Sequence, residues 1–247
     1  MPWRRTRTPY RILVSEVMLQ QTGVARVLPK YRQFLTAFPS LRSVAQSRVQ
    51  DVLGAWKGLG YNRRALALRN AAKVMQERHG SRVPRSLDEL RALPGIGRAT
   101  ASAILVFSFN VPLVFMETNI RRVFIHFFFP GKQSVKDSEL LPLIEKTLDW
   151  KNPREWYYAL MDYGAHLRGS VTNPNLRSAV YTRQAPFEGS LRQLRGRVLE
   201  ILLRLRSADG ADIRKALPRS DPRLAQALDQ LVAEGFLREK NGRYFFR

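Results

Sequence analysis

The stretch Leu93-Pro94-Gly95-Ile96-Gly97-Arg98-Ala99-Thr100-Ala101 places a glycine-rich turn between two segments with helical patterns. Residues 86–92 are predicted to form a short helix with Ser86 as its N-cap. Pro94 cannot continue this helix, and the glycines tolerate positive φ, so the N–H groups of the turn and of the next helix can point outward together. Such donors, reinforced by the helix dipole, bind phosphate. A plain connection between two helices is the alternative.

The charge of the chain favours an anionic partner. Its 247 residues include 42 Lys and Arg against 20 Asp and Glu, which gives a formal net charge of +22. The excess is spread over residues 1–185 and 186–247 alike. A field of this sign attracts polyanions and makes binding to a phosphate backbone sensitive to salt. Nucleic acid is the expected partner, because no apolar run approaches a membrane span and no segment is a low-complexity basic arm.

The sequence contains no cysteine, which excludes disulfides and any metal or iron–sulfur cluster held by thiolates. We therefore expect no cofactor of that kind. Residues 1–5 lack the apolar core of a signal peptide, so we expect a cytoplasmic protein that associates with the nucleoid when it is bound to DNA.

The helical patterns divide the chain into two predicted domains. Residues 1–185 should form an all-α domain with short loops. Its expected helices span 9–21, 24–37, 40–55, 62–79, 86–92, 96–108, 117–127, 136–149 and 153–168. Turn-forming residues at 170–175 and linker-like residues at 184–190 then lead to a second domain, residues 186–247.

The second domain is predicted to be a small winged-helix-like α+β module. Two short strands flank Asn241-Gly242, which is a strong hairpin signal. Helical patterns precede them at 191–205, 210–217 and 222–234. The third of these helices presents Arg223 toward a DNA groove in the manner of helix-turn-helix docking. A module that only packs on the first domain or binds protein is the alternative.

One carboxylate stands out in the N-terminal helical segment. Between Thr8 and Thr22, Glu16 is the single acidic residue among mainly apolar ones, and Gln20 lies one turn further on the same face. Partly apolar surroundings raise the pKa of a carboxyl group, so Glu16 can hold a proton near neutral pH and act as a general acid. Taken alone, a surface glutamate on an amphipathic helix is the simpler interpretation.

Successive blocks of the chain resemble the adenine DNA glycosylases of the MutY type, which belong with endonuclease III to the helix-hairpin-helix glycosylase superfamily. The blocks occur in the family's order between residues 2 and 168: Trp3-Arg4, Pro9 to Thr22, Trp56 to Tyr61, His79-Gly80 and Leu93 to Arg98. The resemblance implies a mainly α fold, with a two-part all-α helix-hairpin-helix glycosylase domain followed by the winged-helix-like module.

The resemblance also implies two catalytic positions. Glu16 matches the glutamate that protonates the departing adenine. Glu117, followed by Asn119, falls where the family has Asp-Gly-Asn, whose aspartate stabilises a cation developing on the sugar. Breaking an N-glycosidic bond needs these parts, because the flipped base must be protonated and negative charge must lie beside the sugar. A capping charge for the helix that follows is the alternative for Glu117.

The remaining implied roles concern DNA. Four residues match side chains that wedge into the duplex and fill the gap around the extruded base, namely Gln20, Gln21, Leu59 and Tyr61. Three residues belong to the hairpin whose amides grip a phosphate, namely Gly95, Gly97 and Arg98. In the family a monovalent cation often accompanies this hairpin, which here would be held by the carbonyls of Leu93 and Ile96.

The sequence departs from the family in four places. Glu117 replaces an aspartate, and the extra methylene can alter or abolish activity. Ala99 stands where endonuclease III has its Schiff-base lysine, so lyase activity is not expected. The cluster cysteines expected after Ala165 are absent, so packing must hold residues 167–183. The domain that recognises 8-oxoguanine is replaced by the winged-helix-like segment, so specificity for that partner is not supported.

These observations predict a monomeric, monofunctional DNA N-glycosylase of base excision repair. Its partner would be double-stranded DNA with a mismatched or damaged base, and adenine is the leading base. One alternative is a mismatch uracil or thymine DNA glycosylase. Another is a non-catalytic DNA-binding protein of the same fold. Glu16 together with Gln21 and Tyr61 favours an enzyme, whereas Glu117 favours the non-catalytic protein.

Overall fold

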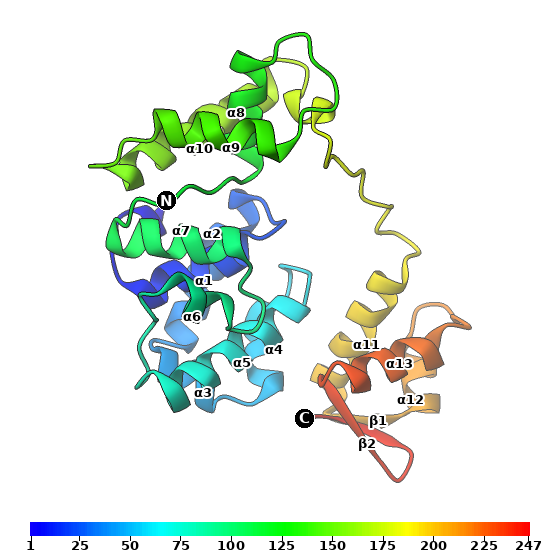
Figure 1. The fold of residues 1–247 in the computed structure, drawn as a ribbon. Helices are drawn as coiled ribbons and strands as arrows, with labels where there is room; N and C mark the ends of the chain where they lie inside the picture. The colour runs from blue at the N-terminus through cyan, green and yellow to red at the C-terminus, as the bar shows by residue number, and fades with distance from the viewer. The chain divides into compact units, whose positions relative to one another are not determined.

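The computed structural model describes all 247 residues, and the chain is mainly helical (Figure 1). It divides into two compact units, each built from two stretches of sequence: residues 1–17 with 83–183, and residues 18–82 with 184–247. Whether residues 1–185 and 186–247 also fold as separate domains stays a prediction. None of the helices is both long and apolar enough to cross a membrane.

Helices alone form the first unit. Its elements are η1 (Pro2–Arg4), α1 (Pro9–Leu19) as far as Val17, α6 (Leu87–Arg91), α7 (Arg98–Phe109), α8 (Thr118–Phe128), α9 (Asp137–Thr147), α10 (Pro153–Ser170) and η2 (Pro174–Arg177). Helix α8 packs against α9, α10 and η2, and α7 packs against α6 and α10. The predicted all-α character of this region is confirmed.

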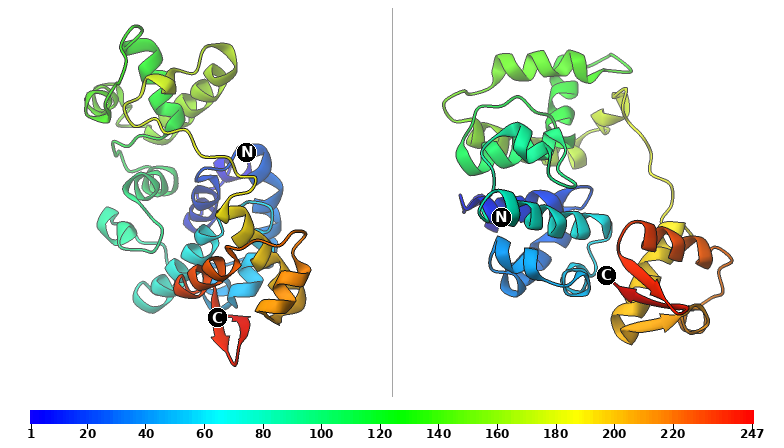
Figure 2. Two further views of the ribbon diagram at one scale, coloured as in Figure 1. Left: turned by 90° about the vertical axis from the view of Figure 1, so that its right-hand side faces the viewer. Right: turned by 60° about the horizontal axis from the view of Figure 1, so that its bottom comes forward.

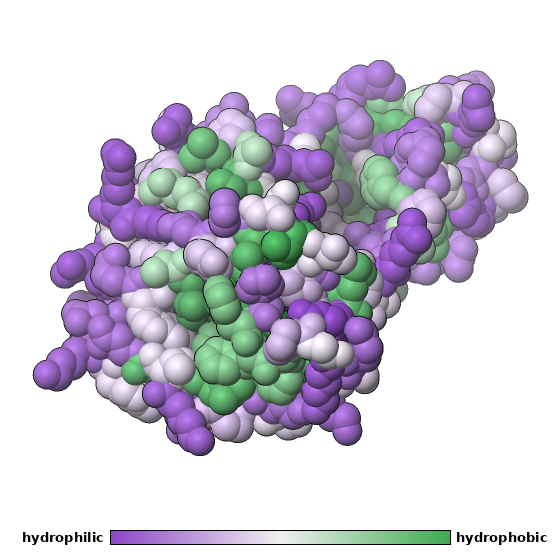
Figure 3. Space-filling model, turned by 90° about the horizontal axis from the view of Figure 1, so that it is seen from above, coloured by the Kyte–Doolittle hydropathy of each residue, from purple (hydrophilic) through white to green (hydrophobic).

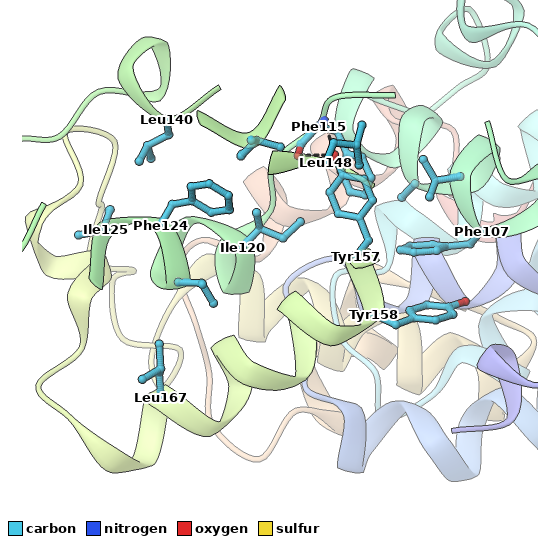
Figure 4. Close-up of a cluster of buried hydrophobic side chains, with 14 of the residues drawn as sticks. Phe107, Phe115, Ile120, Phe124, Ile125, Leu140, Leu148, Tyr157, Tyr158 and Leu167 are labelled. Atoms are coloured by element: carbon cyan, nitrogen blue, oxygen red, sulfur yellow. Dashed lines mark hydrogen bonds between the residues drawn. The ribbon is translucent and has the colours of Figure 1, made fainter. Parts of the chain in front are cut away.

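Stacked aromatic side chains lie among aliphatic ones in the core of the first unit (Figure 4). Phe107 of α7 stacks on Tyr158 of α10 with ring centroids 4.6 Å apart, and Phe115 stacks on Tyr157 at 4.1 Å. The buried Tyr157 hydroxyl accepts from the Phe115 N–H at 3.0 Å and donates to the Leu113 carbonyl at 2.9 Å. Its polar atom is therefore satisfied inside the core, and the irregular segment before α8 is fixed on α10.

Hydrogen bonds as well as packing hold the segment that follows α10. Val135 N–H donates to the Arg177 carbonyl and Ala179 N–H donates to the Val135 carbonyl, both at 2.8 Å. The Asn175 amide donates to the Thr118 carbonyl at 2.9 Å, and the Arg177 guanidinium donates to the Ile125 carbonyl at 3.3 Å. The segment is thus tied to both ends of α8, which adds directional bonds to the packing that the sequence predicts.

Most of the molecular face seen from above is hydrophilic, and a green area of apolar residues interrupts it (Figure 3). Several large hydrophobic side chains of the first unit are exposed: Phe127, Phe128, Leu141, Trp150 and Tyr163. Phe127 stacks on Tyr163 with a centroid distance of 5.7 Å, so these two exposed rings pack against each other.

The second unit begins with four helices, α2 (Val24–Ala37), α3 (Leu41–Gln46), α4 (Val49–Trp56) and α5 (Arg63–Arg78). The prediction of one helix over residues 40–55 is wrong, because the chain breaks at Ser47. There the backbone is extended, and the Ser47 hydroxyl donates to the Val44 carbonyl at 2.6 Å. A local bond of this kind competes with the helical ladder. Helix α4 starts afresh, with Arg48 donating to Asp51 at 2.9 Å.

Residues 184–247 add an α+β module to the second unit (Figure 2). Its elements are α11 (Leu191–Leu205), β1 (Ser207–Asp209), α12 (Gly210–Ala216), α13 (Leu224–Ala233), β2 (Leu237–Lys240) and β3 (Arg243–Phe246). The predicted hairpin is confirmed, with Asn241 at φ 53° and Gly242 at φ 72°, as a type I′ turn requires. The antiparallel sheet has the order β1-β3-β2. The sequence did not predict β1, which has only three residues and no alternation of its own.

Candidate active site

Helix α1 presents Glu16 from an otherwise apolar stretch. Its neighbours Leu13, Val14 and Val17 are buried, while Glu16 itself is half-buried. Burial raises the pKa of Glu16 to about 8, with the negative charge of Glu117 adding to the rise and Arg4 opposing it. The apolar spacing that forms the helix therefore also supplies the environment that keeps the carboxyl group protonated at neutral pH.

Glu117 lies at the N-terminus of α8 and caps it. Its Oε1 accepts from the Asn119 N–H at 2.8 Å and from the Ile120 N–H at 3.0 Å, and its Oε2 accepts from the Asn119 amide at 3.3 Å. Burial raises the pKa of Glu117, and the two backbone hydrogen bonds act in the opposite direction. The structure thus places this carboxylate both at a helix end and within electrostatic reach of Glu16.

Two neighbouring carboxyl groups in a poorly solvated place cannot both carry charge at low cost. Glu117 accepts three hydrogen bonds and lies at the positive end of a helix dipole, which favours its ionised form. Burial and the charge of Glu117 both raise the pKa of Glu16, to about 8, whereas backbone hydrogen bonds and two arginine charges lower the pKa of Glu117 against the effect of its burial. The geometry therefore divides the pair into a proton holder, Glu16, and an anion, Glu117.

Arg4 and Tyr158 lie within electrostatic reach of Glu16. The Arg4 guanidinium lies 4.6 Å from the centroid of the Tyr158 ring and donates to Asp162 at 2.6 Å. Its positive charge lowers the pKa of Glu16, although less than burial and Glu117 raise it. Burial raises the pKa of Tyr158 beyond its usual range, and the charge of Glu16 adds to this. Tyr158 therefore stays a neutral phenol near Glu16.

Asn119 is held from behind by Arg122 and by a close helix contact. The buried Arg122 guanidinium donates to the Asn119 side-chain oxygen at 2.8 Å and to the Gly164 carbonyl of α10. A Cβ at Gly164 would lie 2.3 Å from the Asn119 carbonyl oxygen, so only glycine fits here. The approach of α10 to the first turn of α8 fixes Asn119, and Asn119 in turn bonds Glu117.

The predicted hairpin lies between α6 and α7. Gly95 has φ 74°, a conformation that favours glycine, whereas Gly97 is extended and N-caps α7 with open space where a Cβ would be. The sequence allowed positive φ at both glycines, and the structure uses it only at Gly95. Gly95, Gly97 and Arg98 are exposed. The Leu93 carbonyl accepts from the Ile96 N–H at 3.2 Å. The cation site at Leu93 and Ile96 stays a prediction.

The second unit holds the four residues predicted to enter the duplex. Gln21 and Tyr61 are exposed, and both have positive φ, 53° and 49°. The Tyr61 hydroxyl accepts a hydrogen bond from the Gln184 amide. Gln20 is half-buried, and Leu59 is buried with 1% of its surface exposed. In this conformation Leu59 contributes to packing, and Gln21 and Tyr61 are the ones presented to solvent.

Arg223 precedes α13 and is engaged locally. Its guanidinium donates to both oxygens of Asp221, at 2.9 and 2.7 Å, and to the Gly189 carbonyl at 3.0 Å. The side chain is accessible, yet much of its hydrogen-bonding capacity is used within the module. Its contact with DNA stays a prediction.

The structure adds residues that sequence reasoning missed. Arg4 was part of a recognised block without a role of its own, and no role at the two carboxylates was predicted for Arg122, Tyr158 or Gly164. Each of them contacts a partner that is far away in the sequence, so no local sequence pattern indicates its role.

No group of three or more His, Cys, Asp or Glu side chains is placed to hold a metal ion. An iron–sulfur cluster does not fit the chain, because it offers no thiolate.

Comparison with known proteins identifies the family of the chain. Residues 14–145 match the family model described as HhH-GPD superfamily base excision DNA repair protein. The adenine DNA glycosylase of Buchnera aphidicola subsp. Schizaphis graminum is 34% identical over 168 residues, which are 67% of this chain and 48% of that protein. The adenine DNA glycosylase of Mycolicibacterium smegmatis is 32% identical over 268 residues, 99% of this chain and 90% of that one.

A solved structure of a thermostable thymine-DNA glycosylase aligns with a TM-score of 0.60 and 27% identity, and covers 67% of this chain and 77% of that one. The chain spans about half the length of the Buchnera relatives that it matches. The family model covers more than half of the chain, and the Mycolicibacterium relative aligns along nearly all of it. The chain belongs to the HhH-GPD superfamily of base excision DNA repair proteins.

Proposed function

We propose that this protein is a monofunctional DNA N-glycosylase that removes a mismatched base, most readily adenine, from double-stranded DNA. The observation that carries the proposal is the pair formed by Glu16 and Glu117. Burial raises the pKa of Glu16 to about 8, and Glu117 lies close enough to add to this rise. A carboxylic acid and a carboxylate side by side are what N-glycoside cleavage requires.

The proposed reaction begins with extrusion of the target nucleotide from the stack, which costs a few kcal/mol. Glu16 donates its proton to a ring nitrogen of the base, and the C1′–N bond breaks with its electron pair leaving on the base. The cation that develops at C1′ is stabilised by the Glu117 carboxylate. A water molecule then adds to C1′ and releases a proton, which restores the acid form of Glu16.

The chain has no amine at the position expected for a Schiff-base lysine, because Ala99 stands there in the first turn of α7. Without such a nucleophile the product is an abasic site rather than a nicked strand. The proposal also assigns no cofactor to the reaction, since both steps need only proton transfer and electrostatic stabilisation. The protein would act as a monomer in the cytoplasm, on the nucleoid.

Thymine or uracil opposite guanine is the second candidate substrate. The specific support is the likeness to the thermostable thymine-DNA glycosylase, of whose chain 77% is covered at 27% identity. Adenine is placed first because the sequence relatives named as adenine DNA glycosylases include one that aligns over 99% of this chain.

A panel of labelled duplexes tests the proposal. Each duplex carries one pair: adenine opposite guanine, adenine opposite 8-oxoguanine, thymine or uracil opposite guanine, or a normal pair as control. We expect strand cleavage of the adenine duplexes after alkali, and intact strands without alkali. Cleavage confined to thymine or uracil duplexes would replace adenine by the second candidate. If no duplex is cleaved and Glu117→Asp alone gains excision, the natural protein is a DNA-binding relative without the chemistry.

A further inference from the structure

A single buried arginine on α5 reaches both segments that carry the predicted duplex-entering residues. Arg64 exposes only 8% of its surface. Its Nη1 donates to the Met18 carbonyl at 2.7 Å and to the Gln20 carbonyl. Its Nη2 donates to the Thr22 hydroxyl at 2.9 Å, and to the Gly60 carbonyl at 3.1 Å. One guanidinium therefore spans residues 18–22 and residues 59–61.

Two aromatic side chains, Trp56 and Tyr61, lie against the same guanidinium group. The Arg64 guanidinium carbon lies 5.3 Å from the centroid of the Tyr61 ring and 5.5 Å from that of Trp56. The Trp56 indole N–H donates to the Gly60 carbonyl at 3.2 Å, so Gly60 accepts from both side chains. The ring of Tyr61 thus packs against the Arg64 guanidinium, and the same guanidinium donates to the Met18 carbonyl at the end of α1.

Both segments contain a residue in a costly backbone conformation. Gln21 and Tyr61 have φ of 53° and 49°, values that residues with a Cβ seldom adopt. Such conformations persist only where surrounding contacts impose them, and they concentrate at functional sites. Here each lies within two residues of a carbonyl that accepts a hydrogen bond from Arg64.

We propose that Arg64 is a positioning residue that sets the geometry of Gln21 and Tyr61 relative to each other, so that both enter the duplex together. The inference rests on the proposed function, since it gives these two residues their task. Arg64 itself does not touch the reacting atoms. Its contribution is to remove freedom from two exposed side chains before DNA arrives, which lowers the cost of ordering them on binding.

The guanidinium fork suits this task better than an ammonium group. Arginine offers five N–H donors in one rigid plane, and the acceptors of Arg64 lie on two different segments. A lysine keeps the positive charge but presents a compact group that cannot span both segments. Arg64→Lys therefore separates the geometry of the fork from its charge, and Arg64→Met removes both while keeping an unbranched side chain of similar length.

The first measurement needs no substrate. Hydrogen exchange of the free full-length protein is followed by mass spectrometry for wild type, Arg64→Met, Arg64→Lys and a control, Arg69→Met. Arg69 lies on the same helix and donates to the Ser47 carbonyl at 2.7 Å, away from both segments. We expect exchange to rise at least tenfold in residues 18–22 and 59–61 together in both Arg64 variants, and in neither segment in the control. A rise in only one segment, or a uniform rise over α2 to α5, would overturn the proposal.

The second measurement uses a duplex that wild type cleaves. We expect Arg64→Met and Arg64→Lys to slow single-turnover excision by about 10- to 100-fold, as a misplacement of about 1 Å does. Their Kd for an undamaged duplex should change less than about threefold. Full rescue by lysine, or an equal loss of rate in Arg69→Met, would overturn the proposal. If wild type cleaves no duplex, the proposed function fails, and the exchange measurement still decides whether Arg64 couples the two segments.

Discussion

The Glu16–Glu117 pair of the first unit and Arg64 of the second are both ionisable groups withdrawn from water, yet burial has opposite consequences for them. It raises the pKa of Glu16 to about 8, which brings a carboxyl group into the range where it gains and loses a proton. It lowers the pKa of Arg64 to about 10, which still leaves the guanidinium charged at neutral pH. The first site can transfer a proton, whereas the second can only hold its neighbours.

The partners explain the difference. Glu16 is placed beside a second carboxyl group, a neighbour that opposes its ionisation. Arg64 is surrounded by carbonyl and hydroxyl oxygens and by two aromatic rings, all of which favour its charged form. A carboxyl group buried beside another carboxyl group can exchange its proton near neutral pH. A guanidinium buried among hydrogen-bond acceptors stays charged and holds its neighbours in place. Four changes should sharpen or break this contrast.

The largest effect is expected for Glu16→Gln. The amide keeps the size and hydrogen bonding of the side chain but has no proton to transfer, so excision should fall by about 10²- to 10⁴-fold. DNA affinity should be retained. Single-turnover excision and a binding titration measure both, with the exposed Glu145→Gln of α9 as control. Excision by Glu16→Gln at the wild-type rate would remove Glu16 from the acid role.

Glu117→Gln should slow excision by about 10²- to 10³-fold, because a fixed anion beside developing positive charge is worth several kcal/mol. Glu117→Asp restores a shorter carboxylate and should keep or raise the rate. Both variants preserve an acceptor for the amides of Asn119 and Ile120, so melting temperatures should stay close to wild type. If both variants turn over substrate like wild type, Glu117 is only a helix cap.

The raised pKa of Glu16 predicts two pH dependences. Because the proton is lost near pH 8, excision should fall about tenfold for each pH unit above that value. A carboxyl group whose pKa is higher in the folded state contributes stability that is fully present below about 4.5 and is lost as the pH rises through about 8.

Glu16→Gln removes this pH-dependent contribution to stability. The Tm of Glu16→Gln relative to wild type should therefore be lowest near pH 4.5 and increase by about 10 °C or more up to pH 9. Thermal melts of both proteins at four or five pH values measure this difference. A constant difference across the range would mean that the pKa of Glu16 is not raised by folding.

Arg98→Ala should have the smallest effect. Arg98 is exposed at the hairpin, so its loss should weaken binding to any duplex by about 1 kcal/mol and reduce the slope of log Kd against log salt by about one. Single-turnover excision at saturating protein should not change, in contrast to Arg64. Arg42→Ala, an exposed arginine on α3, is the control. An unchanged salt slope would argue against a phosphate at the hairpin.

The sequence predicted the helical architecture well, because periodic apolar residues and glycine or proline breaks are local signals. The hairpin over residues 92–97 and the Asn241-Gly242 turn are examples. It failed where one side chain changes the backbone, as at Ser47, or where a partner lies elsewhere in the chain, as for β1 on β3. In these places a local side-chain hydrogen bond or pairing with a distant strand outweighs the secondary-structure propensity of the residues.

The candidate site was predictable as far as its two carboxylates, through a resemblance carried by short blocks. Their relationship was not predictable, because α1 and α8 are about a hundred residues apart in the chain. Which of the two carboxyl groups keeps its proton depends on which one accepts the backbone N–H groups at the start of a helix. Only the three-dimensional structure shows that this is Glu117. Arg64 illustrates the same limit, since basic residues are common in this sequence and burial singles out only a few.

The close approach at Gly164 has a consequence for genetics. Every missense change of a glycine codon adds at least one carbon atom, and here the first such atom would meet the Asn119 carbonyl at 2.3 Å. A substitution at Gly164 therefore displaces Asn119, and with it the Glu117 carboxylate that Asn119 bonds, although neither of these two residues is itself changed. Gly164→Ala, the smallest of these changes, is the natural starting point for a temperature-sensitive variant. Silent changes in the same codon are the matched alleles without a phenotype.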